Sequence, residues 1–266
     1  MNLQDTHWLI TGASAGIGAA LAWAAVEHGA KRVVLVARRA DKLRQLAQNI
    51  QEKFPGVEVI WIEADLLEEM TRNNMVEQVF SGGRIDVWVN NAGMGSNGCF
   101  DQLPTSSVLK MVRLNVEALA HLSSLAVQRM KQQPQRSALL QVGSVAGLMP
   151  VPTMGLYAAT KAFVTSLTDS LSGELSGTSV QVHCLSPAPV KTEFLDVANA
   201  EGVLVRQQVP IAQSARSVAL SAIRGLKWNI THIYPWLAWP FPLLAWLTPR
   251  WVWRVTGKVA ARIARQ

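Results

Sequence analysis

Three side chains in the middle of the chain have the types and the spacing needed to protonate a carbonyl oxygen. Tyr157 and Lys161 are four residues apart, so on a helix they share one face about one turn apart. Ser144 follows an apolar run, residues 138–142, that predicts a strand, and therefore lies at the carboxyl end of that strand. The ammonium of Lys161 favours the phenolate, so we expect it to lower the pKa of Tyr157 towards neutrality, where a general acid works best.

The spacing of Tyr157 and Lys161 alone does not establish a catalytic site. A surface tyrosine beside a solvated lysine produces the same pattern. Prolines and Gly155 interrupt the segment after Ser144, and from Leu156 onwards apolar residues recur at helical spacing. A catalytic role therefore depends on a cofactor site elsewhere in the chain.

A glycine-rich segment near the N-terminus has the context of a dinucleotide-binding loop. It reads Thr11-Gly-Ala-Ser-Ala-Gly-Ile-Gly18, with a predicted strand before it and an alanine-rich predicted helix after it. Gly12 permits a tight turn, Gly16 the close approach of a pyrophosphate, and Gly18 the packing of the helix on the strand. The first amides of that helix face the phosphate charge. A purely structural glycine turn is the alternative.

Two arginines after the second predicted strand favour NADPH over NADH. Residues 32–37 predict that strand, and Arg38 and Arg39 follow it, with no acid before Asp41. An NAD site usually has an acid here for the ribose 2′-hydroxyl, whereas an arginine accommodates a 2′-phosphate. We expect Arg38 to carry most of the preference, with Arg39 helping. Two solvated arginines at a strand end are the alternative.

The order of the predicted elements indicates an α/β fold. Strands are predicted at residues 6–10, 32–37, 57–62, 85–89, 138–142, 180–185 and 230–234, with helical patterns between most of them. This alternation predicts a single doubly wound Rossmann-type parallel sheet of about seven strands with helices on both faces. We expect residues 1–234 to form an NAD(P)-binding catalytic domain and residues 235–266 a Trp/Pro-rich extension packed on the domain or on a partner.

Composition bounds the class of protein and its partners. The chain has 266 residues, 49% of them hydrophobic and 16% charged, which is ample apolar material for one large core. The net charge of +7 is scattered, without basic runs or interleaved aromatics, so we expect an anionic cofactor and no nucleic acid. Cys99 and Cys184 lack metal-ligand spacing and no signal sequence precedes Thr6, so we expect a cytoplasmic protein without a metal.

The C-terminal tail is rich in tryptophan. Its tryptophans are Trp236, Trp239, Trp246, Trp251 and Trp253. Prolines at 235, 240 and 242 interrupt the apolar run, so we expect at most short helices and no helix that spans a membrane. One prediction is packing over the substrate entrance or against a partner subunit. The other is peripheral contact with a membrane interface, through the tryptophans and the basic residues that follow them.

Taken together, these residues resemble the short-chain dehydrogenase/reductase family over residues 6–192. The resemblance rests on Thr11-Gly-x-x-x-Gly-x-Gly18, Asp65, Asn90-Asn-Ala-Gly93, Asn115, Ser144 and Tyr157-x-x-x-Lys161, in that order. It implies an NAD(P)-dependent oxidoreductase and a homodimer or homotetramer, paired through the helices that bear Asn115 and Tyr157. One departure lies after the sixth predicted strand, where the family's usual Pro-Gly is Pro187-Ala188.

The resemblance also implies a role for each motif residue. Tyr157 would protonate the carbonyl oxygen as hydride arrives from the nicotinamide, Ser144 would orient that oxygen, and Lys161 would hold the nicotinamide ribose. Asn115 would hold a water that connects Lys161 to solvent. Asp65 would contact the adenine, Asn91 would lie beside the adenosine ribose, and Thr192 would bind the carboxamide. The full set of expected cofactor contacts is Gly12, Ser14, Gly16, Ile17, Gly18, Arg38, Arg39, Asp65, Leu66, Asn91, Ala92, Gly93, Tyr157, Lys161, Pro187, Val190 and Thr192.

The leading hypothesis is an NADPH-dependent carbonyl reductase, or alcohol dehydrogenase in reverse, for a hydrophobic ketone or a 3-oxoacyl, lipid-like substrate. Apolar residues near the predicted acid motivate an apolar pocket; they are Met94, Leu148, Met149, Val151 and Met154. The alternative is a non-catalytic NADP(H)-binding protein that senses redox state or acts as a scaffold at a membrane. The complete set of Ser144, Tyr157 and Lys161 favours the enzyme, because a retired site has no physical need of all three.

Overall fold

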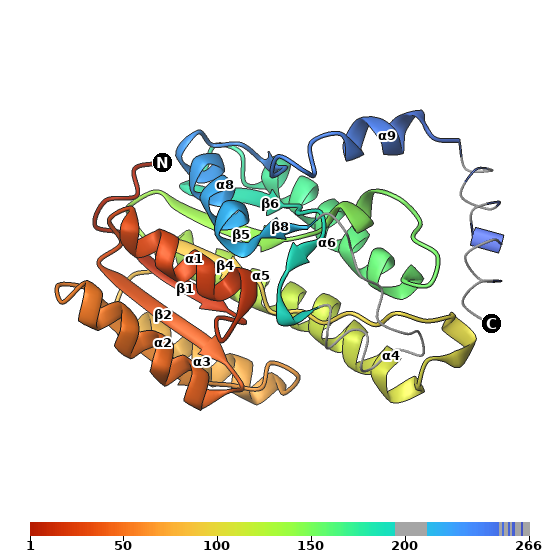
Figure 1. Ribbon diagram of the computed structural model, residues 1–266. Helices are drawn as coiled ribbons and strands as arrows, with labels where there is room; N and C mark the ends of the chain where they lie inside the picture. The colour runs from red at the N-terminus through yellow and green to blue at the C-terminus, as the bar shows by residue number, and fades with distance from the viewer. Residues whose placement is uncertain (195–211, 250–251, 253–254, 256, 259–261, 263–266) are drawn as a thin grey trace.

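A seven-stranded parallel sheet forms the centre of the protein in this computed structural model (Figure 1). Residues 1–194, 212–249, 252, 255, 257–258 and 262 are described. The strands are β1 (His7–Thr11), β2 (Arg32–Ala37), β3 (Glu58–Glu63), β4 (Val87–Asn90), β5 (Ser137–Val142), β6 (Val180–Leu185) and β9 (His232–Ile233). They run in the order β3-β2-β1-β4-β5-β6-β9, all parallel, which confirms the predicted sheet.

Helices cover both faces of the sheet. They are α1 (Gly16–Glu27), α2 (Ala40–Lys53), α3 (Glu69–Ser81), α4 (Thr105–Val112), α5 (Leu119–Met130), α6 (Gly155–Glu174), α8 (Ala215–Lys227) and α9 (Phe241–Leu247). Successive strand residues point to opposite faces, so Trp8 and Ile10 share a core cluster with residues of α1, α2 and α8. Leu9, between them, packs with residues of α3 and α5 instead. Both faces of the sheet are therefore buried, as a doubly wound fold requires.

The helical segment from Thr105 to Met130 has an irregular middle. Between α4 and α5 the segment η2 (Arg113–Ala118) is a π-helix, and Asn115 lies inside it. A π-helix widens the turn and disrupts the regular i to i−4 backbone ladder, and such turns are frequent at functional sites. The sequence pattern does not reveal it, because apolar residues continue at helical spacing through both flanks.

A second, two-stranded sheet lies beside the main one. It pairs β7 (Val190–Lys191) with β8 (Gln213–Ser214), and neither strand is among the predicted ones. Residues 195–211, between the two strands, lie outside the described part of the chain. The Ser214 hydroxyl accepts a hydrogen bond from the Ser217 amide and caps α8.

The described part of the tail contains the short helix α9, and the turn before this helix packs against the domain. Ala238 is fully buried, and Leu237 and Phe241 pack with it against the 3-10 turn η3 (Val145–Leu148). Trp236, Trp239 and Trp246 are exposed, while Trp251 and Trp253 lie outside the described residues. Among the described residues, no helix is long and apolar enough to cross a membrane.

Candidate active site

The predicted site residues gather along the carboxyl edge of the sheet. The strand order reverses between β1 and β4, and in open α/β sheets ligands bind in the crevice at such a reversal. The glycine loop follows β1 and the Asn91–Gly93 segment follows β4, so both border this crevice. Ser144 follows β5, next to β4 in the sheet.

The glycine loop has the shape that a dinucleotide needs. Gly12 and Gly16 have positive φ angles of 65° and 58°, which favour glycine. A Cβ atom on Gly18 would lie 2.6 Å from the amide nitrogen of Asn91 and would collide with the carbonyl of Gly12. The N-cap residue of α1 is Ala15, which offers no side-chain acceptor to the first-turn amides. These amides remain directed at the crevice, where a pyrophosphate would accept their hydrogen bonds.

Asn91 and Thr11 fasten the glycine loop to β4. The Asn91 side chain donates to the carbonyls of Thr11 and Gly12, at 2.8 and 3.2 Å. The Thr11 hydroxyl in turn accepts from the amides of Asn91 and Ala92, at 3.0 and 3.1 Å. The amide of Asn91 is thus engaged in shaping the loop, and a contact with the adenosine ribose remains a proposal.

Ser144, Tyr157 and Lys161 are all buried at the edge of the sheet. Lys161 Nζ donates to the Val142 carbonyl at 2.7 Å and lies 5.8 Å from the centre of the Tyr157 ring. The Ser144 hydroxyl accepts from the Ala146 amide at 3.1 Å. The hydroxyl, the phenol and the ammonium that the sequence singled out are therefore brought together around one point.

The expected lowering of the Tyr157 pKa is not what the structure shows. Burial raises the pKa of Tyr157 to about 12, and the neighbouring Ser144 hydroxyl only partly offsets this. Burial also lowers the pKa of Lys161 to about 8, with Cys184 acting in the opposite direction. Desolvation disfavours every charged form in this dry site, and it outweighs the attraction between ammonium and phenolate on which the expectation rested.

Asn115 links the π-helix to the site. Its side-chain oxygen accepts from the Met94 amide at 2.9 Å, and its amide nitrogen donates to the Met94 carbonyl and the Thr160 hydroxyl at 2.8 and 3.0 Å. A Cβ atom on Gly93 would lie 3.2 Å from this oxygen and 3.6 Å from Lys161 Nζ, so the three residues converge. Protein groups thus occupy the side-chain amide, and a role for Asn115 in holding a water remains a proposal.

A buried polar network lies one residue below the strand ends. The side-chain nitrogen of Asn90 donates to the Ser123 hydroxyl and to the side-chain oxygen of Gln141, at 3.0 and 3.1 Å. Gln141 donates to the same hydroxyl at 2.7 Å, and Trp88 donates to Asn90 at 2.8 Å. Gln141 immediately precedes Val142, whose carbonyl receives Lys161. The network therefore ties α5 to the two strands that carry the site.

The two arginines differ in what they contact. Arg39 donates through Nε and Nη2 to the Ser14 hydroxyl of the glycine loop, at 3.2 and 3.0 Å. Its Nη1 atom and Lys42 Nζ both contact the carboxylate of Glu193, at 2.7 and 2.6 Å. In the described part of the chain, Arg38 is exposed and makes no hydrogen bond or ion pair. Lys42 and Glu193 were not predicted as site residues; the three-residue spacing of Arg39 and Lys42 at a helix start is the signal that could have found Lys42.

The remaining expected cofactor contacts differ in their surroundings. The side chain of Thr192 approaches the glycine loop, with 3.2 Å between its Cγ2 atom and a Cβ atom placed on Gly16. Asp65 accepts from the Leu67 amide at 3.0 Å and so shapes the turn before α3. Ile17 packs on one core cluster and Leu66 is buried in the other. The Pro187 carbonyl accepts from the Val145 amide at 3.1 Å, and Val190 pairs with Gln213.

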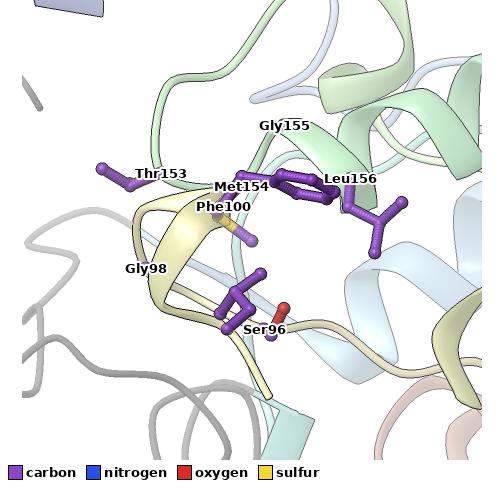
Figure 2. A pocket seen from close by; sticks show the side chains of 8 residues that line it. Ser96, Gly98, Phe100, Thr153, Met154, Gly155 and Leu156 are labelled. Carbon is purple, nitrogen blue, oxygen red and sulfur yellow. The ribbon is translucent and has the colours of Figure 1, made fainter. Parts of the chain in front are cut away.

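A cavity of about 120 Å³, lined by both apolar and polar groups, lies at the start of α6. Figure 2 shows Phe100, Met154 and Leu156 among its lining side chains, with Ser96 as a polar member. Of the five apolar residues expected to form the pocket, Met154 lines this cavity, whereas Leu148 packs under the tail.

The ring of Phe194 packs against the ring of Tyr157. The two ring centres are 5.5 Å apart, and a Cβ atom on Gly95 would lie 2.7 Å from Phe194. Phe194 and Gly95 therefore define the space directly above the tyrosine. Neither residue was predicted, because the loop after Gly93 and the segment after Thr192 carry no motif.

Comparison with known proteins identifies the family. The family model described as short chain dehydrogenase matches residues 6–202. The very-long-chain 3-oxoacyl-CoA reductase of Mus musculus is 31% identical over 239 residues, which cover 85% of this chain and 75% of that protein.

Solved structures agree with this assignment. A short-chain dehydrogenase of Sphingobium yanoikuyae in complex with NADPH is 31% identical with a TM-score of 0.78, over 87% of this chain and 88% of that one. The bulky-bulky ketone specific alcohol dehydrogenase of Comamonas testosteroni is 26% identical with a TM-score of 0.74, over 100% and 95%. The chain therefore belongs to the short-chain dehydrogenase/reductase family and is an NAD(P)-dependent oxidoreductase.

Proposed function

We propose that this protein is an NADPH-dependent carbonyl reductase for a hydrophobic ketone or a 3-oxoacyl thioester, and that it oxidises the corresponding alcohol in reverse. The observation that carries the proposal is the convergence of Ser144, Tyr157 and Lys161 beside the glycine loop. A binding protein without activity would need the loop but not this buried and costly set of polar groups.

The chain's own residues manage one proton in this reaction. NADPH supplies the hydride that reaches the carbonyl carbon. Tyr157 is neutral at pH 7, since burial raises its pKa to about 12, and its hydroxyl donates the proton that the carbonyl oxygen requires. Ser144 donates a hydrogen bond to the same oxygen and orients it. Lys161 is still protonated at pH 7, with its pKa near 8, and its charge stabilises the phenolate that remains.

The apolar surroundings support a hydrophobic substrate. Phe194 and Gly95 border Tyr157, and the cavity at the start of the same helix has Phe100, Met154 and Leu156 in its lining. Two of the similar proteins are named for a very-long-chain 3-oxoacyl-CoA and for bulky-bulky ketones. Apolar walls exclude water from the proton transfer and recognise a substrate by buried area, not by hydrogen bonds.

The preference for NADPH rests on Arg39 and Lys42. Arg39 lies between the glycine loop and the end of β2, where an adenosine 2′-phosphate belongs, and Lys42 adds a second cation on the same side. The main role therefore passes from Arg38, which the sequence favoured, to Arg39. We expect an NADPH preference of at least about tenfold, from one charge-assisted contact.

The protein acts as a homodimer or homotetramer in this proposal, in the cytoplasm or at the surface of a membrane. Leu119, Leu122 and Met130, on the helical segment that follows Asn115, are buried in the monomer. The pairing surface therefore falls to exposed residues of α4, such as Leu109, and to the half-buried Phe163 of α6. Light scattering at micromolar concentration tests this, and a monomer contradicts the pairing.

The proposed activity is tested by mixing the purified protein with NADPH and a panel of ketones and 3-oxoacyl thioesters. We expect turnover by the wild type and a loss of at least about a hundredfold in Tyr157→Phe, which keeps the ring and removes the proton. Full turnover in that variant, or none in the wild type, contradicts the proposal. Tight NADPH binding without turnover on the whole panel favours the redox-sensing or scaffold alternative.

A further inference from the structure

An exposed apolar surface covers the outer side of the tail. Trp236, Trp239 and Trp246 are 67%, 75% and 81% exposed, and three leucines of α9 lie among them. We refer to this group as the tail surface; it consists of Trp236, Trp239, Leu243, Leu244, Trp246 and Leu247. So many large apolar side chains in one short segment exceed the scattered exposure that is normal for a soluble monomer, and they mark an interaction site.

The tail surface lies on α9 and on the turn before it, and this turn packs against the domain. Leu237, Ala238 and Phe241 face inwards and pack with Val145 and Leu148. In Figure 1, α9 lies at the end of the molecule that also carries α4, away from the N-terminus. Because the opposite side of the segment packs on the domain, the tryptophans are left facing outwards.

The charged residues in the C-terminal part of the sequence are all basic. After Glu201 the chain contains no aspartate or glutamate, but nine lysines and arginines. Five of them follow the tail surface, at positions 250, 254, 258, 262 and 265, a spacing of three or four residues. Lys258 and Arg262, the two of these that the structure describes, are exposed. An apolar, tryptophan-rich surface beside an acid-free basic segment is complementary to a membrane interface with anionic lipids.

We propose that the tail surface docks on the interface of a lipid bilayer that contains anionic lipids. The contact is peripheral, because α9 has seven residues and is about 10 Å long, against roughly 30 Å of hydrocarbon. Tryptophan suits this position, since its ring is apolar and its N–H group bonds to headgroups and water. A second copy of the chain fits less well: a two-fold contact would bring two equally basic segments together.

Docking brings the bilayer close to the start of the substrate path. Leu148 packs under the tail, and a Cβ atom on Gly257 would lie 3.5 Å from Pro152, in the loop that leads to the cavity at Met154. A lipid-like carbonyl compound dissolved in the bilayer would reach this loop without crossing water. This consequence rests on the proposed function, whereas the docking itself does not.

The test uses the full-length protein and sedimentation with vesicles of phosphatidylcholine, with and without phosphatidylserine. The variant carries Trp236→Ala, Trp239→Ala and Trp246→Ala together. The matched control is Trp228→Ala, whose side chain is 76% exposed at the end of α8, where the N-terminal ammonium bonds to the Leu226 carbonyl. Reduction of a water-soluble ketone by each protein is measured in parallel, without vesicles.

We expect the wild type and the control to pellet with phosphatidylserine vesicles, and the triple variant to partition at least about tenfold less. Charge reversal by Lys258→Glu and Arg262→Glu, and added salt, should also weaken binding. Equal pelleting of wild type and triple variant, or none by the wild type, overturns the proposal. So does a wild-type dimer that the three substitutions convert to a monomer in the absence of vesicle binding. Loss of ketone reduction in every protein, with vesicle binding intact, refutes the proposed function but not the docking.

Discussion

The guanidinium of Arg39 donates a hydrogen bond to the carboxylate of Glu193, with 2.7 Å between Nη1 and Oε2. Lys42 holds the other oxygen of the same carboxylate at 2.6 Å. The hydrogen bonds from Lys42 and then from Arg39 keep the pKa of Glu193 below its usual range, so this carboxylate is ionised at neutral pH. An acid of the chain therefore engages both cations that the proposed 2′-phosphate needs.

Removal of the Glu193 charge should tighten NADPH binding. In Glu193→Gln the phosphate no longer competes with a carboxylate for Arg39 and Lys42, and an exposed ion pair of this kind contributes about 0.2–1 kcal/mol, or roughly 1.4- to 5-fold in Kd. Titration of cofactor fluorescence measures the effect. NADH, which lacks the phosphate, should gain less. Glu174→Gln, an exposed acid at the end of α6, controls for the change in net charge, and equal gains in both variants would contradict the competition.

Substitutions of Arg38 and of Arg39 should differ in their effect on the preference for NADPH. Arg39→Ala removes the contact with Ser14 and a cation of the phosphate site, so we expect NADPH affinity to fall about tenfold while NADH affinity changes little. Arg38→Ala is the matched control, since it deletes an exposed guanidinium from the adjacent position. A larger loss in Arg38→Ala would return the main role to the residue that the sequence favoured.

Lys161→Met should stabilise the fold while it abolishes activity. Burial lowers the pKa of Lys161 from 10.5 to about 8, which corresponds to about 3 kcal/mol of destabilisation at neutral pH. The lost hydrogen bond to Val142 offsets about 1 kcal/mol, so urea unfolding at pH 7 should show a net gain of about 2 kcal/mol. Lys131→Met, at an exposed position after α5, should be neutral.

The same lysine should make wild-type stability depend on pH. Between about pH 8 and pH 10.5 the unfolded chain still binds the Lys161 proton while the folded chain has released it. The unfolded state thus binds more protons, and the free energy of unfolding contributed by this group rises with pH through that window. Urea titrations across it should show the rise in the wild type. If Lys161→Met shows the same slope, another group is responsible.

Removal of a polar side chain from the buried network below the site should destabilise the protein. Gln141→Leu removes the acceptor of Asn90 and one donor to Ser123, and leaves buried polar groups unpaired at a cost of about 1–3 kcal/mol. Because Gln141 precedes Val142, activity should fall as well, through displacement of Lys161. Gln128→Leu, on an exposed part of α5, is the control for the substitution itself, and equal stability of the two variants would contradict this account.

Local pattern was enough to predict the sheet and to bring the candidate site residues to its carboxyl edge. A parallel strand buried on both faces is a continuous apolar run, as in β2, and its carboxyl end marks where functional side chains belong. The contact between Lys42 and Glu193 is different, because it joins residues 151 positions apart and depends on how the segment after β7 crosses the sheet edge. The pKa of Tyr157 depends on burial, and burial cannot be inferred from the spacing of Tyr157 and Lys161.

The buried inner side of the tail changes what a deletion of that segment would mean. Ala238 and Phe241 complete a small cluster with Val145 and Ala188, next to Ser144 and Pro187. A chain cut after Tyr234 would lose this cover and place apolar surface in water beside Ser144, so misfolding and loss of the proposed turnover would accompany any loss of docking. The segment from Trp236 to Leu247 therefore has two separable roles. Its inner residues Leu237, Ala238 and Phe241 stabilise the domain, and its outer residues can change without loss of that packing.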